Sequence, residues 1–165
     1  MGSLVKRIDQ IIEDKSSLKH SFYQMWSEGK LELDSLKGYS KEYYQLVKQV
    51  PQFMEPMIDG ATSDMKDELI QNMKEESKHI PLWEKFAGSM GISESELQDY
   101  EGLEKTKMAV SNLGSLMDSF DNGACAMYAF EKEIPKVSKT KLEGLKEFYG
   151  IDSKDAIEYF EEHMT

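Results

Sequence analysis

The sequence predicts an all-α protein that folds as a helical bundle. Apolar residues recur every three or four positions along nearly the whole chain, which is typical of amphipathic helices. No segment shows the alternation of β-branched and polar residues that marks a half-buried strand. The chain has 165 residues, which is the size of one domain. We therefore expect residues 1–165 to form a single domain of packed helices with short connections.

The boundaries of the expected helices come from capping and breaking residues. Pro81 suits the first turn of a separate short helix, residues 121–123 (Asp-Asn-Gly) break another, and Pro135 stops the one that follows. Asp152 opens the last helix, which we expect to continue to the end of the chain. The expected helical segments are, in order, residues 4–13, 17–28, 33–50, 63–80, 81–90, 108–120, 124–134, 140–149 and 152–165.

The charge and cysteine content exclude several classes of partner. The formal net charge is −11, whereas binding to nucleic acid or to anionic membranes needs an excess of Lys and Arg. No stretch is long and apolar enough to cross a bilayer, and residues 1–15 are too charged for a signal peptide. Cys125 is the one cysteine, so no intramolecular disulfide can form. We expect a cytoplasmic protein that binds neither nucleic acid nor membranes.

Glu131 is the most informative single residue. It follows an uncharged run, residues 124–130, and its neighbours on the same helical face are apolar. A helix that is apolar all round is usually buried, and a buried carboxylate must be paired or bound to a cation. Glu131 is therefore a candidate metal ligand. The charged residues 132–133 leave the alternative that the helix reaches solvent at this point.

A second candidate is the pair formed by Glu76 and His79. Their spacing of three residues places both on one face of a helix, as in the carboxylate-bridged iron proteins built from helical bundles. The adjacent Glu75 is an alternative to Glu76, and either carboxylate could instead lie on the surface.

His163 is the third candidate. It shares a helical face with Ala156, Tyr159 and Phe160 and so points into the bundle. A single inward histidine is compatible with a hydrogen-bonded core residue as well as with a ligand. His20 stands at the start of a helix, where capping is the simpler interpretation.

These residues lie within sequence blocks that resemble the heme-oxygenase-like superfamily, which includes the TenA and PqqC proteins. The blocks occur in the family's order over almost the whole chain. They are HSFYQMWSEGKL at 20–31, NMKEESKHIPLW at 72–83, MYAFEKEIP at 127–135, VSKTKLEGL at 137–145, FYGID at 148–152 and YFEEH at 159–163. The sequence looks most like the di-iron oxidase branch that contains the chlamydial protein associating with death domains.

The resemblance implies a heme-oxygenase-like helical bundle with a non-heme di-iron centre. Members of this branch bind two irons through glutamates, an aspartate and histidines, activate O₂ and oxidise a small molecule or their own side chains. Their ligand positions match Glu76, His79, Glu131 and His163 here. The resemblance thus predicts an iron-dependent oxidase or oxygenase in cofactor biosynthesis, of the kind that forms para-aminobenzoate or that PqqC represents.

The resemblance also implies two reacting side chains. Members that form para-aminobenzoate are thought to consume a tyrosine and to use a lysine, at positions that match Tyr23 and Lys141. A further tyrosine of that branch is Phe130 here. Two other functions stay open at this point. One is hydrolysis of a thiamin-like compound by Cys125, as in TenA proteins, and the other is a non-enzymatic role in protein binding.

Two features depart from the family pattern. The spacing between the first glutamate and its histidine is shorter than usual, and the family pattern continues past His163 with an aspartate and another histidine that the 165 residues do not supply. We therefore expect none or one of the family's two irons, no oxygenase turnover and a bundle without its last helix. Apolar side chains around Tyr128, Tyr159 and Phe160 would then be less covered, favouring a homodimer.

Overall fold

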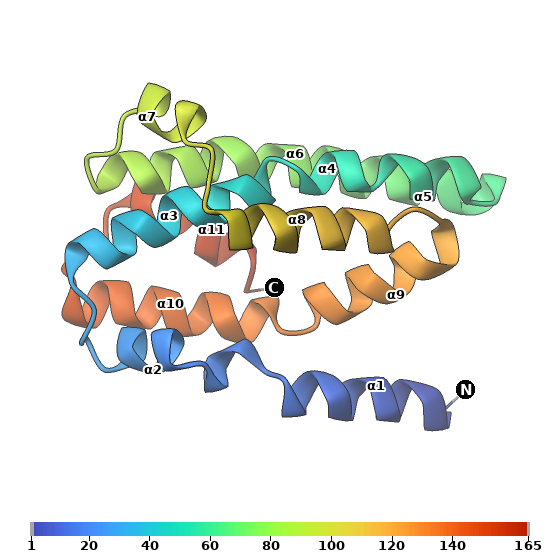
Figure 1. Ribbon diagram of the computed structural model, residues 1–165, viewed down its shortest axis with the longest axis horizontal. Helices are drawn as coiled ribbons and strands as arrows, with labels where there is room; N and C mark the ends of the chain where they lie inside the picture. Colours follow the sequence, from blue (N-terminus) through green and yellow to red (C-terminus); the bar gives the residue numbers. More distant parts are fainter. Residues whose placement is uncertain (1, 165) are drawn as a thin grey trace.

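The computed structural model describes residues 2–164, and every regular element in that range is helical (Figure 1). The all-α prediction is therefore confirmed for this part of the chain. Within it, no helix is both long enough and apolar enough to span a membrane. The elements are α1 (Gly2–Asp14), a 3₁₀ turn (Ser17–Lys19), α2 (Ser21–Ser27), α3 (Leu33–Val47), α4 (Val50–Phe53), α5 (Glu55–Gly60), α6 (Ser63–Ser89), α7 (Glu94–Asp99), α8 (Glu104–Leu116), α9 (Phe120–Glu131), α10 (Ile134–Phe148) and α11 (Lys154–Glu162).

Local chemistry explains several helix starts. The His20 side chain caps α2 by accepting a hydrogen bond from the Phe22 backbone N–H, as its position suggested. Prolines 51 and 56 stand in the first turns of α4 and α5, where a missing N–H costs nothing. The short helix α7 was not predicted, although Ser93 caps it in the way its sequence allows.

The prediction that Pro81 separates two helices is wrong. Residues 63–89 form the single long helix α6, with Pro81 in its interior. Proline removes one backbone hydrogen bond and strains the preceding turn, which costs about 3 kcal/mol in an isolated helix. Packing of α6 against α11, α3, α4 and α5 offsets that cost. The continuous helix carries both the Glu76–His79 pair and the core residue Trp83.

Three other predicted boundaries are also wrong. Residues 121–123 do not break a helix but lie in the first turn of α9, where Gly123 lets α9 approach Met57. Pro135 lies in the first turn of α10 and does not end α9, which stops at Glu131, so the expected helix 140–149 is the second half of α10. The last helix, α11, ends at Glu162, and His163 forms its C-cap.

The main hydrophobic core joins α2, α3, α6, α10 and α11. Its two tryptophans are fully buried, and each donates its indole N–H to a backbone carbonyl: Trp26 to Lys141 at 3.1 Å and Trp83 to Ser40 at 2.8 Å. These bonds satisfy the only polar atom of each ring. A second, smaller core contains the buried residues Met54, Met57 and Met117. Together the two cores fix the helices that carry the candidate site.

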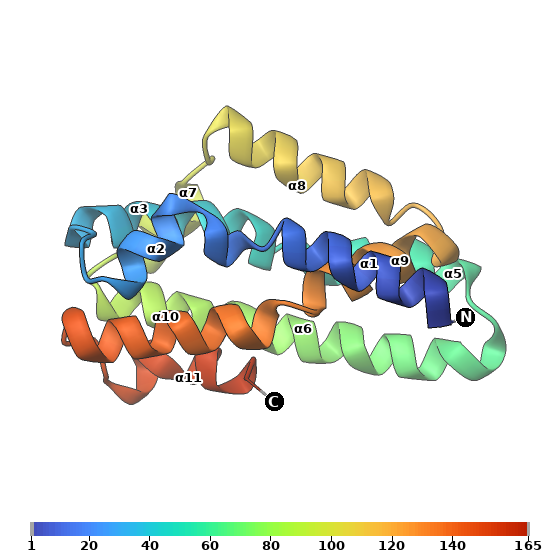
Figure 2. The same ribbon diagram turned by 90° about the horizontal axis from the view of Figure 1, so that it is seen from below.

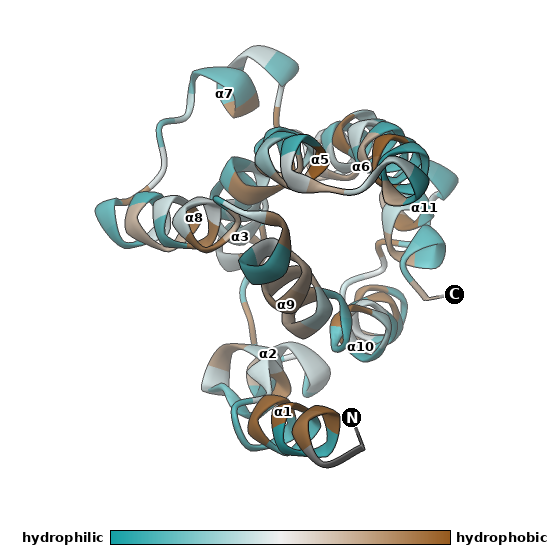
Figure 3. Ribbon diagram, turned by 90° about the vertical axis from the view of Figure 1, so that its right-hand side faces the viewer, coloured by the Kyte–Doolittle hydropathy of each residue, from teal (hydrophilic) through white to brown (hydrophobic). Residues whose placement is uncertain are grey.

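The helices around the site leave one side of α9 uncovered. Figure 3 looks along the bundle: α6, α11, α10 and α9 form a ring, and α8 lies at the edge of the molecule. The apolar run 124–130 was expected to be buried, but Ala124, Cys125 and Ala129 are exposed. The expectation failed because α9 packs on α5, α8, α1 and α10 with only part of its surface.

Candidate metal centre

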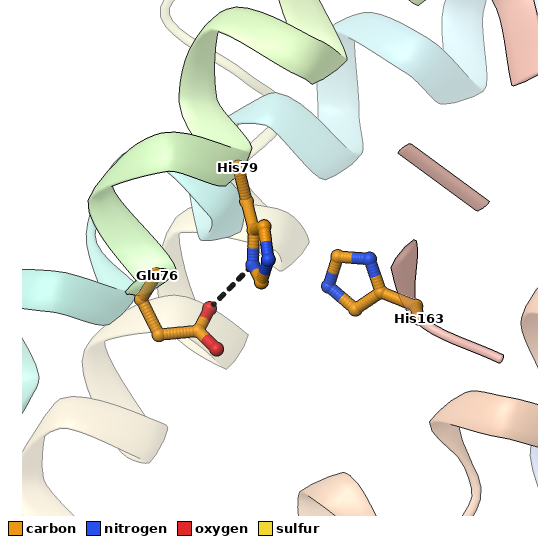
Figure 4. Close-up of side chains that lie close together, drawn as sticks. All are labelled: Glu76, His79 and His163. Atoms are coloured by element: carbon orange, nitrogen blue, oxygen red, sulfur yellow. Dashed lines mark hydrogen bonds and ion pairs between the residues drawn. The ribbon is translucent and has the colours of Figure 1, made fainter. Parts of the chain in front are cut away.

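Three of the predicted metal ligands lie together. Glu76 and His79 come from α6, and His163 comes from the end of α11 on the opposite side (Figure 4). One potential ligand atom from each residue lies within 4.8 Å of the other two. The ring centroids of His79 and His163 are 4.2 Å apart. Residues separated by more than eighty positions in the sequence thus form one compact cluster.

The Glu76–His79 pair takes its geometry from the helix. With a spacing of three residues, both side chains project from the same face of α6, and Glu76 Oε2 lies 3.2 Å from His79 Nδ1. Both side chains are about one-fifth exposed, so the pair is reachable but partly desolvated. Glu75, the alternative carboxylate, is exposed and accepts a hydrogen bond from Gln71. The structure therefore groups Glu76, and not Glu75, with the histidines.

His163 is oriented by the backbone of its own helix. Its Nδ1 lies 2.7 Å from the Tyr159 carbonyl oxygen, an acceptor, so Nδ1 carries the proton and donates it. Nε2 is then left with a lone pair for a metal. Burial lowers the pKa of His163, which keeps the ring neutral and able to bind a cation.

Glu131, the fourth predicted ligand, is only partly buried and faces the same cleft. The cleft has a volume of about 880 Å³ and is lined mainly by residues of α5, α6, α9 and α11, among them Glu76, His79 and Glu131. Burial first, and the Glu76 carboxylate second, raise the pKa of Glu131 to about 7. Glu131 is not among the three residues whose ligand atoms lie within 4.8 Å of one another.

The donor set fits a non-heme iron. Two imidazoles and one carboxylate are the protein ligands of many Fe(II) oxygenases, in which the remaining positions stay open for substrate and O₂. The residues present are therefore those that an iron ion would require.

Lys141 lies in the core, where aromatic rings surround it. The side chain is 3% exposed, and its Nζ lies 4.6 Å from the ring centre of Tyr43, 5.0 Å from Tyr39, 5.6 Å from Tyr23 and 5.9 Å from Phe160. Ring faces attract a cation but solvate it less than water does. Burial therefore lowers the pKa of Lys141 to about 7. We refer to Lys141 and these four aromatic residues as the lysine cage.

The lysine cage contains both residues that the resemblance marked as reactants. The hydroxyl oxygens of Tyr23 and Tyr39 lie 3.4 Å apart, and burial raises the pKa of both residues. Tyr43 hydrogen-bonds to Tyr159, the residue whose carbonyl orients His163. The cage and the metal ligands are therefore joined through adjacent side chains.

Three tyrosines of this region, Tyr39, Tyr43 and Tyr159, carry no sequence signal that distinguishes them from ordinary core residues. Their helical spacing is indeed that of core positions, and Tyr39 and Tyr43 stack one turn apart on α3. The sequence does not show that Lys141, on the distant helix α10, lies opposite these tyrosines, because that depends on how the helices pack. A lysine on an otherwise apolar face of α10 is the signal that could have revealed the cage.

Comparison with known proteins gives a consistent result. Residues 37–165 match the model of a family described as iron-containing redox enzymes. The chain is 35% identical to the 4-aminobenzoate synthase of Chlamydia pneumoniae, a match that covers 99% of this chain and 76% of that protein. It is 27% identical to the 4-aminobenzoate synthase of Nitrosomonas europaea, with coverage of 97% and 72%.

The fold is that of a solved TenA homologue from Pseudomonas syringae pv. tomato. The TM-score is 0.75 at 16% sequence identity, and the match covers 88% of this chain and 65% of the homologue, just under two thirds of its length. This likeness bears on the fold alone. Together with the family match, it confirms the resemblance on which the sequence prediction rested. The chain belongs to the heme-oxygenase-like family of iron-containing redox enzymes.

Proposed function

We propose that the protein is an iron-dependent oxidase that forms 4-aminobenzoate, or a close aromatic relative, from its own Tyr23. The observation that carries the proposal is that a cluster of two histidines and one carboxylate stands beside a buried lysine–tyrosine cage. The names of the relatives from Chlamydia pneumoniae and Nitrosomonas europaea support the choice of product.

In this proposal Glu76, His79 and His163 hold one iron, and the Glu131 carboxylate compensates its charge. Iron, when bound, supplies the redox chemistry by which O₂ oxidises an organic substrate. A second iron would need ligands beyond the three clustered residues, because binding must compete with hydration of the ion. We therefore assign one iron to this chain.

The residues of the lysine cage have distinct roles in the proposal. Tyr23 supplies the aromatic ring that is oxidised, and Lys141 acts beside it as an amine. With a pKa of about 7, Lys141 is partly unprotonated at neutral pH and so offers a nitrogen lone pair, which an ordinary lysine does not. Tyr39 and Tyr43 exclude water from this amine and keep it against the Tyr23 ring.

Product analysis tests the proposal. The chain is loaded with Fe(II) without oxygen and then exposed to O₂, and 4-aminobenzoate is measured by mass spectrometry, with the intact mass of the protein as a second readout. Because the reaction consumes Tyr23, we expect no turnover but at most one product molecule per wild-type chain, accompanied by a loss of protein mass, and none from Tyr23→Phe. Equal product from Tyr23→Phe would contradict the assignment. Tyr100→Phe, outside the cage, serves as the matched control.

The proposal includes a cytoplasmic, homodimeric protein. A reducing compartment would keep Cys125, which is exposed on α9, as a free thiol. Of the side chains that were expected to be less covered, Tyr159 and Phe160 are buried in the core, so that expectation is wrong for them. Self-association is supported instead by large apolar side chains on the surface of α1, where Leu4 is 62% and Ile11 is 59% exposed. Hydrolysis of a thiamin-like compound is not proposed, because Cys125 lines neither the cleft nor the lysine cage.

A further inference from the structure

A second pocket lies between α3 and α8. It has a volume of about 410 Å³. Most of its wall is apolar or aromatic, from Tyr39, Tyr43 and Leu46 on α3 and from Ala109, Val110 and Leu113 on α8. Figure 2 shows that α8 stands apart from the main body of the molecule. The volume is in the range of pockets that bind small molecules.

The pocket exists because α8 is attached at its two ends and not in its middle. At the start of α8, Glu42 accepts hydrogen bonds from the Leu103 backbone N–H and from Tyr100. Near the end, Gly114 packs so closely on Phe53 that a Cβ would lie 2.7 Å from its ring. No described residue of α8 is fully buried. The small side chain of Ala109 lies between these two attachments.

The polar groups of the pocket gather at one end. Glu42, Lys105 and Thr106 are its polar lining residues. Hydrogen bonds from Thr106, Tyr100 and Leu103 outweigh burial and keep the pKa of Glu42 low, so its carboxylate is already engaged. Lys105 is exposed, and the ion pairs of this turn are made by Lys107 instead. The pocket thus offers a ligand two stacked tyrosine rings, apolar walls and the Lys105 cation.

The pocket adjoins both halves of the site. Tyr39 and Tyr43, which line it, are also the two rings closest to Lys141. Tyr43 and Leu46 also border a small void of about 10 Å³ that reaches Glu76, His79 and His163. Two rings of the lysine cage, Tyr39 and Tyr43, therefore also form part of the wall of the pocket.

We propose that the α3–α8 pocket binds a monocyclic aromatic carboxylate, with its ring against Tyr39 and Tyr43 and its carboxylate at Lys105. The proposal rests on the proposed function in one respect: it takes this ligand to be the product on its way out of the lysine cage. Binding itself requires neither iron nor turnover, so it can be examined separately from the reaction.

The test is titration of the metal-free chain with 4-aminobenzoate, without oxygen, by calorimetry or ligand-observed NMR. We expect saturable binding that Ala109→Trp abolishes, because the indole would fill the pocket. Met108→Trp is the matched control, since Met108 is 62% exposed and outside the lining, and it should bind normally. Lys105→Gln should weaken binding about tenfold, as expected for loss of a charge-assisted contact. Lys74→Gln replaces an exposed lysine on α6 and should leave binding unchanged.

Aniline lacks the carboxylate, so the wild type should bind it about tenfold more weakly than 4-aminobenzoate. The Lys105→Gln variant should bind aniline and 4-aminobenzoate with equal affinity. Binding that survives Ala109→Trp, or that is equal for aniline and 4-aminobenzoate, would overturn the proposal. If the pocket binds 4-aminobenzoate as described but the iron-loaded chain makes no product, the proposed reaction fails and the pocket stands. If product forms and the metal-free chain does not bind it, the pocket is rejected and the reaction stands.

Discussion

At Lys141, burial controls the charge, and this makes stability depend on pH. Its pKa falls from 10.5 in the unfolded chain to about 7 in the folded one, so the unfolded chain binds more protons between these values. Stability should therefore rise with pH from about 7 towards 10.5. We expect the Lys141→Met variant to be more stable than wild type at pH 7 and this difference to shrink by about 2 kcal/mol at pH 9. Urea unfolding at both pH values measures it, and a constant difference would contradict the account.

At Glu131 the dependence of stability on pH runs in the opposite direction. Burial and Glu76 raise its pKa to about 7, so ionising it costs stability progressively as the pH rises from about 4.5 to 7. In the metal-free protein, Glu131→Gln should stabilise by on the order of 2 kcal/mol at pH 8 and by almost nothing at pH 4. The same substitution should weaken iron binding. Thermal unfolding with and without Fe(II) distinguishes the two effects, and a variant that is stabilised equally at both pH values would refute the assigned cause.

At the scale of single residues, the sequence predicted what lies along one helix better than what meets across the bundle. The Glu76–His79 pair followed from a spacing of three, because a helix turns at a known rate. The approach of His163 to that pair depends on how α11 packs on α6, which no local pattern specifies. The exposure of Cys125 was mispredicted for the same reason, since the number of neighbours of α9 is a tertiary property.

At the scale of elements, the contact between α10 and α2 depends on a glycine. A Cβ at Gly144 would lie 2.6 Å from the Trp26 ring and 3.1 Å from its backbone oxygen. Gly144→Ala should therefore push the two helices apart and destabilise the fold by about 2 kcal/mol. A Cβ at Gly38, in α3, would have no neighbouring atom within 4 Å, so Gly38→Ala should stabilise by about 1 kcal/mol. Equal changes in the free energy of unfolding for Gly144→Ala and Gly38→Ala would argue against this packing.

The helix boundaries show which part of the architecture is determined by residues close together in the sequence. Capping residues and helical periodicity predicted most helices to within a few positions, including α1, α3 and the start of α6. Pro81 and Pro135 were misread because proline is compatible with both the interior and the first turn of a helix when other elements support it. Helix α7 was missed because it is short and contributes only Leu97 to the core.

At the scale of the whole molecule, we expect a homodimer that uses the exposed face of α1. Within the chain, the polar contacts of this helix include the hydrogen bond that Asp9 accepts from Tyr128 on α9 and the ion pairs of Asp9 with Lys132 and of Glu13 with Lys136. Light scattering should give twice the chain mass of 19.0 kDa, and the double variant Leu4→Lys, Ile11→Lys should be monomeric. Met108→Lys on α8 is the control and should stay dimeric. A wild type that is monomeric at all concentrations would contradict this arrangement.

The family match extends over residues 37–165, and the three clustered ligands all lie within it. The central claim is that Glu76, His79 and His163 hold an iron, and the most direct measurement is the iron retained per chain after loading with excess Fe(II) without oxygen and desalting. We predict about one iron for wild type and for His20→Ala, whose histidine only caps α2, and none for His163→Ala. Two retained irons per wild-type chain, or an undiminished amount in His163→Ala, would contradict it.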